Sequence, residues 1–142
     1  MNIFEKYLNK ITDLILKNQK FLKLSNLNNF KGVIVEIPPS EFNYDLSCNV
    51  SLVLGKINKT NSIDLANIIK DLIIKNLNDF NFVEIAGPGF LNLKLSDEAL
   101  IDNINIILEN KKMYGKKNSN NNFNIEFVSA NPTGPMHVGH GR

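Results

Sequence analysis

Cysteine, tryptophan and arginine are almost or wholly missing from this sequence of 142 residues. Cys48 is the only cysteine, so no disulfide can form within the chain and a zinc site built from cysteines is excluded. We expect Cys48 to be a small buried apolar side chain. The only arginine is Arg142, and the formal net charge is +2, which is compatible with a nucleic-acid partner but does not indicate one.

Long apolar runs are also missing. No stretch approaches the ~18 consecutive apolar residues that a membrane span needs. Residues 1–20 lack the order of a secretory signal, because charged and polar residues interrupt every apolar run. The hydrophobic share of 43% and charged share of 21% are typical of a globular protein, and the length fits one domain and a fragment. We therefore expect a cytoplasmic protein with no membrane partner. A monomer is the expected oligomeric state.

The spacing of apolar residues predicts helices over about 1–20, 62–77 and 96–113, since apolar side chains recur there three or four positions apart. Asp45 is expected to cap a further helix over 46–54. Strands are predicted from β-branched and alternating patterns. They cover residues 32–37, 82–86, 90–95 and 123–128.

Gly87-Pro88-Gly89 separates two of these strands and favours a tight hairpin. Side chains alternate along a strand, so Phe90, Asn92 and Lys94 share one face and three leucines share the other. The leucine face is expected to be buried, and the Phe90 face is offered to solvent or a ligand. A core position for Phe90 and a purely solvated Asn92 are the simpler alternatives.

Residues 116–122 are polar and cannot form a core, so they indicate a linker between a domain at 1–115 and a second unit at 123–142. In that second unit a strand runs into Asn131-Pro132-Thr133-Gly134-Pro135, which favours an irregular turn. A helix beginning after such a turn presents unpaired amides that suit phosphates. His137 and His140 lie three positions apart and would share a helix face, and Gly139 permits close approach to the backbone.

His137-Val138-Gly139-His140 resembles the ATP-site signature of class I aminoacyl-tRNA synthetases, and the whole stretch 125–142 resembles its arginyl-tRNA synthetase version. Two upstream stretches, 42–50 and 85–92, are similar to motifs of the same family. This resemblance implies an α/β chain. It consists of an α+β amino-terminal tRNA-binding domain followed by the first strand and turn of a Rossmann-like catalytic domain.

The resemblance also implies a reaction, namely ATP-dependent activation of L-arginine and its transfer to tRNA(Arg), with Mg²⁺ accompanying the ATP and no metal bound by the protein itself. The implied catalytic and ATP-binding residues are His137 and His140, with Gly139 also at the ATP. The implied contacts of L-arginine are Glu126, Ser129, Asn131 and His137. The implied contacts of the tRNA D-loop are Phe90 and Asn92.

Three other interpretations compete with this one. The chain could be a free-standing RNA-binding module derived from a synthetase. The histidine pair could be metal ligands, although no third ligand lies nearby in the sequence. A nucleotidyltransferase with a similar histidine motif is disfavoured by the stretch 131–135. Because the sequence ends before the rest of a nucleotide-binding sheet, we expect these 142 residues alone to be catalytically inactive.

Overall fold

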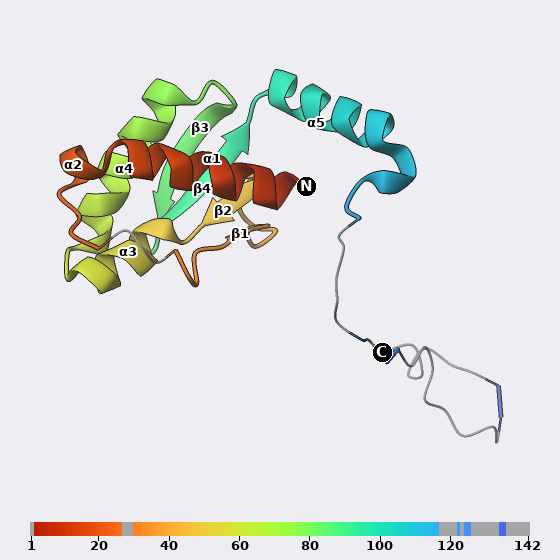
Figure 1. Cartoon of the computed structure of the whole chain (residues 1–142), viewed down its shortest axis with the longest axis horizontal. Coiled ribbons are helices and arrows are strands. Elements are labelled where there is room, and N and C mark those ends of the chain that lie inside the picture. The colour runs from red at the N-terminus through yellow and green to blue at the C-terminus, as the bar shows by residue number, and fades with distance from the viewer. Residues whose placement is uncertain (1, 27–29, 117–121, 123, 126–133, 136–142) are drawn as a thin grey trace.

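The computed structural model describes residues 2–26, 30–116, 122, 124–125 and 134–135 (Figure 1). In chain order the elements are α1 (Ile3–Lys17), α2 (Gln19–Leu22), β1 (Val35–Glu36), β2 (Leu46–Cys48), α3 (Val50–Asn58), α4 (Ser62–Asn76), β3 (Phe80–Ala86), β4 (Phe90–Leu95), α5 (Asp97–Asn110) and a 3₁₀ turn (Lys111–Met113). This part of the chain combines helices with a small antiparallel sheet, as expected for the amino-terminal domain. The expected strand at 123–128 and the Rossmann-like continuation lie outside the described residues.

The four strands form one antiparallel sheet in the order β1-β2-β4-β3. β3 and β4 make the predicted hairpin, with Ala86 opposite Phe90 at its tip. β4 also pairs with β2, where Cys48 lies opposite Leu91 and Leu46 opposite Leu93. The hairpin therefore forms one half of the sheet. Within the described residues, its strand β4 pairs with β2, and β2 pairs in turn with β1.

Helices α1, α3 and α4 pack on one face of the sheet and enclose the core. The core side chains with no exposed surface include Tyr7, Ile11, Ile15, Val50, Leu54, Ile69, Ile73, Leu91 and Leu93. Burying one Leu or Ile side chain contributes roughly 1.5–3 kcal/mol. The opposite face of the sheet carries polar and charged side chains together with Phe82 and Phe90.

Side-chain caps begin the three predicted helices. Asn2 accepts a hydrogen bond from the backbone of Glu5, Asn61 accepts from Ile63 and Asp64, and Ser96 accepts from Ala99. Each cap satisfies an amide that the first helical turn leaves unpaired. The predictions of helices over 1–20, 62–77 and 96–113 are confirmed, the last with its regular part ending at Asn110.

The predicted helix over 46–54 is wrong at its start. Leu46–Cys48 is strand β2, and helix α3 begins only at Val50, after Asn49. Asp45 does not cap a helix. Its carboxylate accepts a hydrogen bond from the Leu95 backbone at 2.9 Å and pairs with Lys94. Pairing with the distant strand β4 outweighs the local helical pattern.

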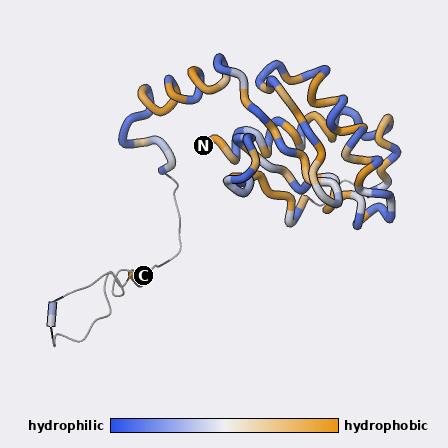
Figure 2. Tube along the Cα trace, turned by 180° about the vertical axis from the view of Figure 1, so that it is seen from behind, coloured by the Kyte–Doolittle hydropathy of each residue, from blue (hydrophilic) through white to orange (hydrophobic). Residues whose placement is uncertain are grey.

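α5 extends away from the sheet and its covering helices (Figure 1). Its inner side is held by Asn103, which donates a hydrogen bond to Tyr7 Oη at 3.5 Å and accepts one from Lys6 at 3.2 Å. Apolar and polar residues alternate along it (Figure 2), and Ile101, Ile104 and Leu108 are more than half exposed. Among the described residues, no helix combines the length and apolar character required to span a bilayer.

Candidate nucleic-acid interface

A row of polar side chains crosses the open face of the sheet. Strand register places Glu36 opposite Ser47, Ser47 opposite Asn92, and Asn92 opposite Glu84. Their neighbours along each strand point into the core, because side chains alternate. The open face therefore presents hydrogen-bonding groups from all four strands in a single line.

A pocket of about 350 Å³ lies on this row. That volume falls within the usual range for small-molecule sites and can hold a nucleobase. Its walls combine apolar and aromatic side chains with a few polar groups. The lining residues are Glu36, Pro38, Pro39, Phe42, Ser47, Ala86, Gly87, Pro88, Phe90 and Asn92.

The floor of the pocket contains two polar side chains whose surfaces are mostly covered by the protein. Asn92 is 4% exposed and Ser47 is 6% exposed, and neither side chain forms a hydrogen bond with another described residue. No polar side-chain atom of the described residues is both buried and without a hydrogen-bond partner, so the polar atoms of Asn92 and Ser47 reach the open space of the pocket. They are therefore accessible to a ligand that offers a donor and an acceptor.

Polar contacts fix the loop that forms one wall of the pocket. Tyr44 donates a hydrogen bond from its hydroxyl to the Glu84 carboxylate, and this bond raises the pKa of Tyr44. Lys94 donates to Asp45 at 3.1 Å and to Asn43 at 3.3 Å. These contacts bind the segment between β1 and β2 to the β3-β4 hairpin on the open face, beside Asn92.

The Gly87–Gly89 turn contacts the first turns of helices α3 and α4. Ser51 donates a hydrogen bond from its hydroxyl to the Gly89 carbonyl. Gly89 has φ +130°, and a Cβ at this position would lie 3.1 Å from the Ser62 carbonyl oxygen. Only glycine fits both the backbone conformation and the space. The turn therefore sets where β4 begins and where Phe90 lies.

The two residues predicted to contact tRNA, Phe90 and Asn92, line the same pocket. Their expected exposure needs correction, because Phe90 is half-buried and Asn92 lies almost fully buried on the pocket floor. Lys94, on the same face of β4, forms an ion pair with Asp45. Sequence reasoning missed Ser47, Glu36 and Phe42.

The predicted catalytic unit lies outside the described residues. This applies to every residue expected at the ATP and at L-arginine: Glu126, Ser129, Asn131, His137, Gly139 and His140. Within residues 2–26 and 30–116 and the few described positions beyond them, no three His, Cys, Asp or Glu side chains come together in a way that could hold a metal ion. Burial raises the pKa of Cys48 to about 12, so its thiol is not a nucleophile in the folded chain.

Comparison with known proteins places the chain in a family. The sequence profile of the arginyl tRNA synthetase N-terminal domain matches residues 2–95. The arginine-tRNA ligase of Pelagibacter ubique is 46% identical over 144 residues, covering all of this chain and 25% of the relative. That of Wolbachia sp. subsp. Brugia malayi is 40% identical over 147 residues, covering 100% and 24%. That of Thermotoga maritima is 44% identical over 113 residues, covering 76% and 20%.

The matched region contains the complete sheet and its three covering helices, and it ends at the last residue of β4. The chain spans about a quarter of the length of the relatives that it matches throughout, 25% and 24% for the two above. Because the family profile matches residues 2–95, a region that contains the whole pocket, this chain belongs to the arginyl-tRNA synthetase family.

Proposed function

We propose that this chain is the RNA-binding first part of an arginine-tRNA ligase and that the open-face pocket holds one unpaired base of tRNA(Arg). The observation that carries the proposal is the pocket floor, where the polar atoms of Asn92 and Ser47 are accessible from the pocket and no side-chain hydrogen bond within the described residues engages them. Proteins recognise unpaired RNA bases by stacking them on aromatic side chains and by hydrogen-bonding their edges. Phe42 and Phe90 supply aromatic walls, and Asn92 and Ser47 supply donors and acceptors.

The charges around the pocket favour a neutral base over a phosphate. Glu36 lines the pocket, Glu84 lies opposite Asn92, and the neighbouring Lys94 is paired with Asp45. An anion would meet carboxylates here without an available cation, whereas a base presents a neutral edge. We assign the base to the D-loop, as the resemblance of the stretch 85–92 to the family motif implies.

The parent reaction follows from family membership and remains a proposal for this chain. Adenylation of L-arginine by ATP, supplied as its Mg²⁺ complex, would precede transfer to tRNA(Arg). We assign His137, Gly139 and His140 to the ATP, where imidazole and backbone donors can stabilise negative charge as pyrophosphate leaves. We assign Glu126, Ser129, Asn131 and His137 to L-arginine, because a carboxylate can bind a guanidinium group in bidentate fashion.

Fluorescence anisotropy with tRNA(Arg) transcripts and the 142-residue chain tests the pocket. Asn92→Ala removes the edge contact, and we expect weaker binding by roughly 5- to 150-fold, equivalent to about 1–3 kcal/mol. Phe90→Ala should lose a similar amount through stacking. Asn81→Ala and Phe82→Ala are matched controls, because both residues are exposed on β3 and neither lines the pocket.

A set of transcripts, each with one D-loop base replaced, then identifies the bound nucleotide. We expect one replacement to weaken binding to the wild-type chain and to have little further effect on Asn92→Ala. Wild-type affinity in both pocket variants, with unchanged circular dichroism, would overturn the pocket assignment. The alternative of a free-standing RNA-binding module predicts the same binding. Arginine-dependent pyrophosphate exchange by the protein, in the presence of tRNA, distinguishes a ligase from such a module.

A further inference from the structure

Of the described residues that line the open-face pocket, Glu36 alone is charged. It lies at the β1 end of the polar row, where strand pairing places it opposite Ser47, and Ser47 opposite Asn92. Its neighbour Val35 is buried in the core, whereas Glu36 itself is exposed on the open face. A ligand on the pocket floor therefore has a carboxylate at one end.

The two carboxylates of the polar row differ in what they already bind. Glu84, at the β3 end, accepts a hydrogen bond from the Tyr44 hydroxyl and is not among the residues that line the pocket. The side chain of Glu36 forms no hydrogen bond or ion pair with another described residue. The acceptor oxygens of Glu36 are therefore available to a ligand.

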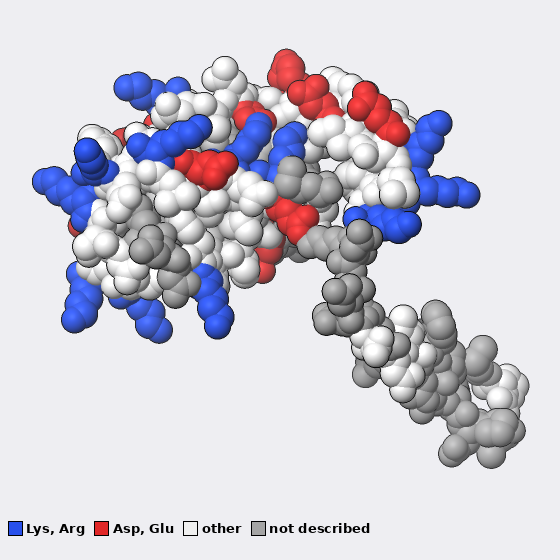
Figure 3. Space-filling model, viewed as in Figure 1, with Lys and Arg blue, Asp and Glu red and all other residues white. Residues whose placement is uncertain are grey.

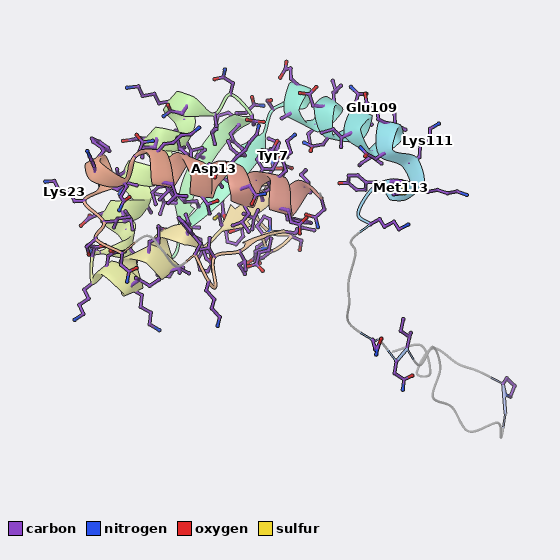
Figure 4. All side chains as sticks on the ribbon, in the orientation of Figure 1. Tyr7, Asp13, Lys23, Glu109, Lys111 and Met113 are labelled. Carbon is purple, nitrogen blue, oxygen red and sulfur yellow. The ribbon has the colours of Figure 1, made fainter. Side chains whose placement is uncertain are left out.

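Within the described part of the chain, no lysine pairs with this carboxylate. The ion pairs there use Lys10 and Lys94, with partners other than Glu36. Figure 3 views the molecule from the side covered by α1, and lysine side chains (blue) project outward around it. Figure 4 shows Lys23 and Lys111 projecting from opposite ends of the molecule. The pocket therefore offers a ligand a carboxylate that no bound cation neutralises.

A free carboxylate selects among the RNA bases, because it accepts hydrogen bonds and donates none. Adenine, guanine and cytosine each carry an exocyclic amino group that donates, and protein carboxylates bind the amino group of cytosine in this way. Uracil offers a single N–H, and two carbonyl oxygens flank it. A carboxylate that accepts from that N–H also lies close to two partial negative charges. The carboxylate therefore favours a base with an amino group over uracil.

The other two polar side chains of the pocket do not make this distinction. The Asn92 amide contains both donors and an acceptor, and the Ser47 hydroxyl also donates and accepts. Each can turn to serve either an amino group or a carbonyl at the same place on a base. Glu36 can serve only the amino group, so it is the side chain that fixes the direction of hydrogen bonding in the pocket.

We propose that Glu36 is the specificity-determining residue of the open-face pocket and that it selects an unpaired base with an exocyclic amino group over uracil. The inference rests on the proposed function, because the pocket must hold a base before Glu36 can read its edge. Phe42 and Phe90 stack on a base of any kind, since every base has a π-face. Glu36 adds the chemical class of the base that is bound.

The test exchanges an amino group for a carbonyl on the same ring of the bound base. Transcripts of tRNA(Arg) carry cytosine or uracil, and adenine or hypoxanthine, at the D-loop position that the replacement series identifies. Fluorescence anisotropy with the 142-residue chain gives the ratio of affinities for each pair. We expect the wild-type chain to bind the amino base roughly 5- to 30-fold more tightly. Glu36→Gln should bring both ratios close to one, because a glutamine amide both accepts and donates.

Glu41→Gln is the matched control, because Glu41 is exposed in the loop after β1 and does not line the pocket. Both variants remove one negative charge and should bind every transcript somewhat more tightly, but only Glu36→Gln should change the ratios. Glu36→Asp keeps a carboxylate and should keep the preference for the amino base.

Two results would overturn the inference: a wild-type chain without a preference for the amino base, or ratios that Glu36→Gln leaves unchanged. Weaker binding by Asn92→Ala would still uphold the pocket in either case. Wild-type affinity of both Asn92→Ala and Phe90→Ala would overturn the two proposals together.

Discussion

Gly89 is the single residue on which the start of β4 depends most directly. Its φ of +130° is a conformation that side chains rarely adopt, and the Ser62 carbonyl oxygen occupies the place of a Cβ. We expect Gly89→Ala to lower the free energy of unfolding by about 1–3 kcal/mol. Gly87→Ala is the matched control. Gly87 has φ +52° with nothing within 4 Å, so it should lose only the cost of a left-handed alanine, about 1–2 kcal/mol.

Urea denaturation followed by circular dichroism measures both variants. An equal loss for the two glycines would show that the contact with Ser62 contributes nothing. Affinity for tRNA is a second measurement on these variants, because a displaced turn would move Phe90. Gly89→Ala should therefore also weaken tRNA binding under conditions in which it is fully folded, and Gly87→Ala should weaken it less.

Cys48 predicts a dependence of stability on pH. Burial raises the pKa of its thiol from 9.0 to about 12 in the folded chain, whereas the unfolded thiol ionises near its ordinary value. The folded state then binds more protons than the unfolded state above pH 9. The stabilisation is complete below pH 9 and is lost as pH rises toward 12. We expect the free energy of unfolding to fall between about pH 9 and pH 12, and to fall less in Cys48→Ala.

The residue-level predictions from sequence succeeded where a motif was local. Phe90 and Asn92 follow a Gly-Pro-Gly turn in a regular alternation. The local sequence was therefore enough to predict that they share one face of the strand. Ser47 was not readable, because its place on the pocket floor comes from pairing with Asn92 far along the chain. The burial of Asn92 has the same cause, since the loop carrying Phe42 covers that face only in the folded structure.

At the scale of elements, the start of α4 offers a clean test of capping. The Asn61 side chain accepts hydrogen bonds from Ile63 at 2.8 Å and Asp64 at 3.3 Å. We expect Asn61→Ala to destabilise the chain by about 1 kcal/mol, and Asn61→Asp to retain stability because a carboxylate also accepts these bonds. Asn67→Ala serves as control. Asn67 is an exposed interior position of the same helix, where alanine is the better helix former. Thermal and urea unfolding distinguish the three variants.

The elements that sequence predicted best are long and periodic. α1 and α4 are 15 residues each and α5 is 14, so several turns repeat the same apolar spacing. β2 has three residues and β1 two, and so short a strand carries no alternation of its own. The helical pattern of 46–54 belonged in fact to α3, and the prediction extended it across Leu46–Cys48. The strand and helix proposed for 123–142 stay predictions.

For the whole molecule, we expect α5 to open before the rest of the described domain unfolds. Only Ala99 and Asn103 are buried within it, and the matched family domain ends at residue 95, before α5 begins. Few buried contacts mean a low free energy of local opening. Native-state hydrogen exchange should show fast exchange of amides beyond Ile104 and slow exchange in β4 and α4. Equal protection of α5 and β4 would show that the helix is part of the cooperative unit.

The strand order β1-β2-β4-β3 has a consequence for the synthesis of the protein on the ribosome. β2 must remain without its inner partner while α3, α4 and β3 are made, because that partner is β4. Closing a ladder across so long a separation costs entropy before any contact repays it. Ser47 and Asn92 meet only in that ladder. A nascent chain thus possesses no complete pocket floor until Leu95 has emerged, and the pocket then forms in one step together with the sheet.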